Sequence, residues 1–114
     1  MIEKQTASHY IWGNGCDGWC LLTADTLSII EERIPPGGSE IRHHHQIARQ
    51  FFYVLAGILS FEINGKEIDL TPRQGIEIAP SVSHRVFNRF SHDAEFLVIS
   101  SPPSHDDRIV DEES

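Results

Sequence analysis

The chain has 114 residues, a length that suits one domain and leaves no room for two. Apolar residues make up 39% of it and charged residues 23%, so the composition predicts a folded globular protein rather than a disordered one. Its 17 acidic and 9 basic side chains give a formal charge of −8. This acidic balance disfavours a nucleic-acid partner, because binding to a phosphate backbone depends on Lys and Arg.

Neither a leader segment nor a membrane span is evident from the sequence. The N-terminal stretch MIEKQTASHYIWG lacks the apolar core of a signal peptide, and nothing approaches the roughly 20 apolar residues of a spanning helix. We therefore expect a soluble cytoplasmic protein with no membrane partner. Cys16 and Cys20 stand in CDGWC, which is not the C-x-x-C spacing of redox and zinc sites. We interpret them as two unpaired thiols.

Three regions follow one another along the chain. Residues 1–26 mix aromatic residues with Gly, which suggests an arm packed on the rest of the domain or on a partner subunit. Residues 27–103 contain short apolar and β-branched runs between Gly and Pro turns, with no lasting helical period. The predicted strands are residues 27–34, 51–55, 58–63, 66–70, 75–78, 84–90 and 96–100. Residues 104–114 form an acidic tail that we expect to fray beyond about Val110.

The predicted strands indicate an all-β fold. Asn64-Gly65 stands between SFEI and KEIDL, and this dipeptide favours a type I′ turn because both central residues of that turn need a positive φ. The two flanking strands should therefore be antiparallel neighbours. Seven short strands without helical crossovers leave a sandwich, a jelly roll or a barrel as the architecture.

Histidine residues carry the clearest chemical pattern. His43 and His45 are two residues apart, so in a strand their side chains share a face, whereas His44 points away from it. Two imidazoles hold a metal ion only with further donors from elsewhere, since such ions take four to six ligands. His84, at the head of another predicted strand, is the expected third ligand. The pattern predicts a site for one divalent ion, such as Zn, Fe, Mn or Ni.

Gln50 is the expected fourth ligand. Of the two polar residues that precede the strand after His45, Arg49 cannot coordinate a cation, whereas Gln50 offers an amide oxygen. Gln50 has the opposite parity from His45, so the chain must bend between them for both to face the interior. With Gln50 inward, Phe52 lines the same cavity, and Phe51, Tyr53 and Leu55 face outward.

These residues fall at the spacings of a known family. The stretch PGGSEIRHHHQIARQFFYVLAG resembles the first cupin motif, with Gly37, His43, His45 and Gly57 in register and Gln50 at the usual Glu place. The stretch QGIEIAPSVSHRVFN is similar to the second motif, with His84 as its histidine. The resemblance covers about residues 27–101 and implies a cupin double-stranded β-helix, or jelly-roll barrel, around a metal site.

The sequence departs from the cupin motifs at three positions. Arg73 aligns with the opening Gly of the second motif and Ser81 stands where Gly is usual, which affects turn geometry. Gln50 in place of Glu removes one negative charge. This should weaken metal binding and leave the bound ion a stronger Lewis acid.

The ligand set narrows the activity without naming it, because the cupin fold hosts many reactions. Three His plus Gln resembles small cupins that tautomerise unsaturated uronate sugars. This likeness favours a Lewis-acid enzyme of the isomerase or tautomerase type that acts on a small sugar- or keto-acid-like molecule. The alternatives are an Fe(II)-dependent dioxygenase and a module that binds a small molecule without catalysis. The motif positions offer no carboxyl group that could serve as a general base, so the catalytic residues remain unassigned.

Other residues are assigned to the substrate or to a partner subunit. Arg42 and Arg49 suit recognition of a carboxylate or phosphate, since guanidinium binds such groups through two hydrogen bonds. Phe52 and Asn88 share the inward faces of the ligand strands, so we expect them beside the substrate. The aromatic arm and the outward apolar side chains, together with the pairing common among cupins, favour a homodimer.

Overall fold

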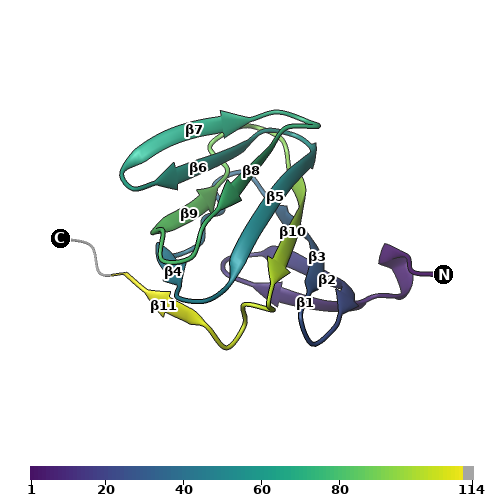
Figure 1. Cartoon of the computed structure of the whole chain (residues 1–114). Coiled ribbons are helices and arrows are strands. Elements are labelled where there is room, and N and C mark those ends of the chain that lie inside the picture. Colours follow the sequence, from purple (N-terminus) through teal and green to yellow (C-terminus); the bar gives the residue numbers. More distant parts are fainter. Residues whose placement is uncertain (112–114) are drawn as a thin grey trace.

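The fold is built almost entirely from antiparallel β-strands, arranged in two sheets (Figure 1). The computed structural model describes residues 1–111. The six-stranded sheet has the order β1 (Ser8–Trp12), β2 (Cys16–Thr23), β3 (Ser28–Ile34), β10 (Ala94–Ser101), β5 (Arg49–Ala56), β8 (Gly75–Ile78). The five-stranded sheet has the order β11 (Arg108–Val110), β4 (His43–His45), β9 (His84–Phe87), β6 (Leu59–Ile63), β7 (Lys66–Leu70). This arrangement confirms the predicted all-β jelly-roll barrel.

The seven predicted strands all form, with ends within three residues of those expected. The structure adds β1 and β2 inside the predicted arm, where β2 pairs with β3 and so extends the barrel sheet. It also adds β11 in the predicted tail, paired with β4. The tail beyond Asp111, where we expect fraying, lies outside the described residues. Within residues 1–111 no helix is long and apolar enough to cross a membrane.

Strand alternation places the core between the two sheets. On β5, Phe52 and Val54 are buried, whereas Phe51 and Leu55 are exposed, as their parity predicts. Phe52 packs edge-on against Phe61 of the other sheet, with ring centroids 5.2 Å apart. The buried apolar side chains form one cluster that includes Phe52, and the ring of His84 lies beside that of Phe52, with centroids 6.1 Å apart.

Positive φ angles at two of the turns explain which residues stand there. Asn64 and Gly65 have φ of 49° and 83°, and Ile63 pairs with Lys66 across them, so the predicted hairpin between β6 and β7 is confirmed. Gly57, at φ 73°, lies so close to the facing chain that a Cβ would stand 2.1 Å from the carbonyl oxygen of Asp93. Only glycine fits there.

Candidate metal centre

Three buried imidazoles meet between β4 and β9. His43 and His84 are paired residues of these antiparallel strands, and His45 lies two residues further along the same face of β4. Their ring centroids are 4.5 Å apart for His43 and His84, 5.0 Å for His43 and His45, and 5.9 Å for His45 and His84. One nitrogen from each lies within 4.8 Å of the others, which is close enough to share one metal ion.

The second nitrogen of each ring is held by the backbone. The Nδ1–H groups of His43 and His84 donate to the carbonyl oxygens of Ile41 and Val82, at 2.8 and 2.9 Å, and that of His45 donates to Asp107 at 3.2 Å. A carbonyl oxygen only accepts, so the proton of each neutral ring is on Nδ1 and Nε2 keeps its lone pair. This arrangement is typical of metal-ligating histidines, whose orientation is set by such outer bonds.

The side chain of Gln50 is oriented by two serines. Its Nε2 donates to the hydroxyl oxygens of Ser100 and Ser104, at 3.1 and 3.4 Å, which directs the amide oxygen the other way. The predicted bend between His45 and Gln50 is present. Asp107 stabilises it, because its carboxylate accepts the backbone N–H groups of residues 46, 47 and 48 at 3.1, 2.8 and 2.9 Å.

Three atoms that could bind a metal ion are buried without a hydrogen-bond partner. Within residues 1–111, the Nε2 atoms of His45 and His84 and the Oε1 atom of Gln50 have no hydrogen-bond partner. Leaving such a group buried and unsatisfied costs about 1–3 kcal/mol, so each calls for an explanation. Imidazole nitrogens and an amide oxygen are donors that Zn, Fe, Mn and Ni accept. The residues therefore fit a divalent metal ion.

Burial keeps the three imidazoles neutral. Desolvation, with a smaller contribution from neighbouring imidazoles, lowers the pKa of all three histidines, that of His43 to about 3. Neutral imidazole is the form that binds a metal, so competition from protons is weak at neutral pH.

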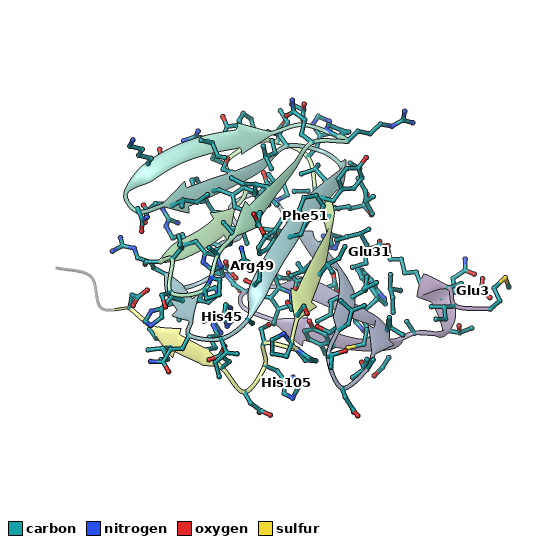
Figure 2. All side chains as sticks on the ribbon, viewed as in Figure 1. Glu3, Glu31, His45, Arg49, Phe51 and His105 are labelled. Carbon is teal, nitrogen blue, oxygen red and sulfur yellow. The ribbon has the colours of Figure 1, made fainter. Side chains whose placement is uncertain are left out.

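A cavity of about 210 Å³ opens beside these donors. His43, His45 and Gln50 line it, whereas His84 lies deeper, with 1% of its surface exposed. Its other walls come from both sheets and from the C-terminal segment: Tyr10, Trp12, Ile30, Glu32, Glu40, Phe52, Val98, Ser100, Ser104, His105 and Arg108. His45 and His105 lie at the same end of the molecule (Figure 2).

The structure places two carboxyl groups in this cavity that the sequence analysis did not identify. Desolvation raises the pKa of Glu32 to about 7 and that of Glu40 to about 8. One pattern could have revealed Glu32, because strand parity puts it on the same inward face as Ile30 and Ile34. An acidic residue between two inward apolar residues is a functional candidate.

Of the four predicted substrate residues, one lines the cavity and three do not. Phe52 lines it. The guanidinium groups of Arg42 and Arg49 donate instead to Glu62 and Glu77, each at 2.9 Å, and neither arginine lines the cavity. The amide of Asn88 is buried, and its Nδ2 donates to the carbonyl oxygens of Ile34 and His92. Asn88 thus ties together chain segments beside the barrel core.

The chain belongs to the cupin family. The family model described as "Cupin domain" matches residues 30–100, which hold the three histidines and Gln50. Fold, family and ligand geometry together define a small cupin with a candidate metal site.

Particular proteins are similar to this chain at low sequence identity. The chain is 29% identical over 80 residues to the tetracenomycin polyketide synthase protein TcmJ of Streptomyces glaucescens, covering 70% of this chain and 52%, about half, of TcmJ. Among solved structures it is similar to the polyketide cyclase RemF of Streptomyces resistomycificus, with a TM-score of 0.87, 18% identity and coverage of 100% and 86%. It also resembles KdgF from Halomonas sp., with a TM-score of 0.84, 17% identity and coverage of 92% and 96%.

Proposed function

We propose that this cupin binds one divalent metal ion and uses it as a Lewis acid to isomerise or tautomerise a small oxygenated substrate. The ligands are the Nε2 atoms of His43, His45 and His84 and the Oε1 atom of Gln50. The observation that carries the proposal is the set of buried, unpaired donors beside a cavity that also holds carboxyl groups. When bound, the ion would polarise a carbonyl group and lower the cost of forming an enol.

The cavity walls support a small substrate with a polar end. The cavity, about 210 Å³, is smaller than the roughly 300 Å³ at which pockets for drug-sized ligands begin. Trp12 and Phe52 give it an apolar side. Arg108 gives it a cation with no ion pair among residues 1–111, and a guanidinium suits a carboxylate. A keto acid or a keto sugar fits this combination. The likeness to the two polyketide proteins also supports a carbonyl-bearing substrate.

Proton exchange tests this function without the natural substrate. The protein is stripped with a chelator, reloaded separately with Zn, Mn, Ni or Fe(II), and incubated in D2O with pyruvate or dihydroxyacetone. Proton NMR should show faster loss of the protons next to the carbonyl with the loaded protein than with the stripped one. Equal rates would contradict the proposal. Oxygen uptake confined to the iron-loaded form, measured with an oxygen electrode, would favour a dioxygenase instead.

We further propose that the chain forms a homodimer through the outer face of the six-stranded sheet. Phe51 and Leu55 of β5 are 40% and 42% exposed there, and a hollow of about 420 Å³ includes Phe51 and Ile99. Figure 2 shows Arg49 and Phe51 on β5. Light scattering should give twice the chain mass of 12.9 kDa, and Phe51→Glu should shift the mass to that of one chain. A single-chain mass for the unsubstituted protein at micromolar concentration would contradict the dimer.

A further inference from the structure

Glu32 occupies a position in the cavity that packing alone does not explain. It extends from β3, in the sheet opposite the strands that carry the three histidines, and lines the same cavity as His43, His45 and Gln50. Its neighbours on the same face of β3 are the apolar residues Ile30 and Ile34. Burying a carboxyl group there is costly, and such cost is commonly found at functional sites.

Glu32 also differs in its partners from the glutamates that pair with a lysine or an arginine. Glu31, the next residue, is paired with Lys4, Glu62 with Arg42 and Arg85, and Glu77 with Arg49; these pairs stabilise the ionised carboxylates. Within residues 1–111, Glu32 makes no ion pair. Its hydrogen bond is with Tyr10, whose hydroxyl group donates to Oε2 at 3.3 Å. The carboxyl group is therefore free to exchange a proton with a molecule in the cavity.

The other proton acceptors along the wall are less suited. The Oε1 atom of Glu40 accepts the backbone N–H of Val86 at 2.9 Å and lies 3.9 Å from Nδ1 of His43, so this carboxyl group already supports the ligand strand. The side chain of His105 is 73% exposed and contacts Asp106. Glu32 therefore remains as the carboxyl group that lines the cavity and bonds neither to the backbone of a ligand strand nor to a metal-ligand candidate.

We propose that Glu32 is the proton-transfer residue of this site, positioned by Tyr10; the assignment rests on the proposed isomerase function. The Glu32 carboxylate takes a proton from the carbon next to the substrate carbonyl. The C–H electron pair becomes a C=C bond, and the carbonyl π pair moves onto oxygen. Glu32 then returns the proton to a different carbon or to oxygen, which regenerates the carboxylate. The net reaction moves one proton and needs no oxidant or reductant.

The electrostatics of the cavity support this role. Desolvation raises the pKa of Glu32 to about 7, whereas the Tyr10 hydrogen bond and the charge of Arg108 oppose the rise. Glu40, His43, His45 and His105 are the other titratable groups along the wall. A proton-transfer group works best with a pKa near the working pH. The carboxylate form dominates above about pH 7, so the exchange rate should rise with pH through that region.

Two substitutions on the same strand test the assignment. Glu32→Gln keeps the shape of the side chain and should lower the exchange rate of the metal-loaded protein by more than about 100-fold, the lower range for general acid–base catalysis. Glu31→Gln makes the same change on the opposite face of β3, beside Lys4, and should leave the rate unchanged. Elemental analysis should find the same metal content in both variants. If Glu32→Gln exchanges protons as fast as the unsubstituted protein, the role assigned to Glu32 is wrong, whereas the proposed isomerase function still stands.

A third variant and a titration give readouts that do not depend on the rate. Tyr10→Phe removes a hydrogen bond that lowers the pKa of Glu32, so the midpoint of the pH–rate profile should move upward. In metal-free protein labelled with ¹³C at the glutamate carboxyl carbons, a signal that titrates near pH 7 should disappear in Glu32→Gln. The absence of such a signal would also overturn the assignment. If the unsubstituted, metal-loaded protein exchanges no protons, it is the proposed function that fails, and the assignment fails with it.

Discussion

Replacing His45 with alanine is expected to abolish tight binding of a divalent ion, whereas replacing the adjacent His44 with alanine should leave binding intact. His45 directs its unpaired Nε2 atom towards His43 and His84. Loss of an outer partner of a metal ligand already weakens binding by about 10–100-fold, so loss of the ligand itself should cost more than about 100-fold. His44 is the matched control, because its Nδ1 atom is bonded instead to the Asp111 carboxylate at 2.8 Å.

The measurement compares the three proteins, purified without a histidine tag, by calorimetric titration with Zn and by elemental analysis. Thermal unfolding gives an independent reading, because an ion that binds the folded chain at 100 times its dissociation constant adds about 2.7 kcal/mol of stability. This gain should appear in the unsubstituted protein and in His44→Ala and be absent in His45→Ala. Stoichiometric, tightly bound metal in His45→Ala would contradict the ligand set.

Replacing Asp107 with alanine should weaken metal binding by about 10–100-fold, although Asp107 is not among the proposed ligands. Its carboxylate accepts three consecutive backbone N–H groups between His45 and Gln50, and its carbonyl oxygen accepts Nδ1–H of His45. The three N–H bonds lower the pKa of this carboxyl group below its ordinary value. Removing the carboxylate releases the bend that brings two ligands of opposite parity to one site.

Asp106→Ala is the matched control, since its carboxylate is 91% exposed and contacts the side chain of His105. The same calorimetric titration should show unchanged affinity for Asp106→Ala and a lower melting temperature only for Asp107→Ala. Acid should reproduce the effect: protonation of Asp107 below its depressed pKa removes the acceptor, so the contribution is present at neutral pH and is lost at strongly acidic pH. Equal metal affinity in both variants would show that the bend forms without Asp107.

Much of the candidate metal centre was predictable because it depends on the spacing of residues that are close together in the sequence. Side chains two residues apart share a face of a strand, which selected His43 and His45 and set His44 aside. The need for an acceptor oxygen selected Gln50 over Arg49, and the bend that this choice required is present. In contrast, Arg42 and Arg49 were assigned to the substrate by chemical type alone, and the structure places each beside a glutamate outside the cavity.

The sequence by itself determined seven of the strands, their inward faces and the spacing of the ligands, because alternation along a strand needs no knowledge of what lies across from it. Only the tertiary structure decided what shares the cavity with those ligands. Sheet pairing and the packing of two sheets join residues that are far apart in the chain, so β3 brings Glu32, β1 brings Tyr10 and β11 brings Arg108 to the cavity (Figure 1). The metal ligands follow from local pattern, whereas the proposed proton-transfer group follows from the fold.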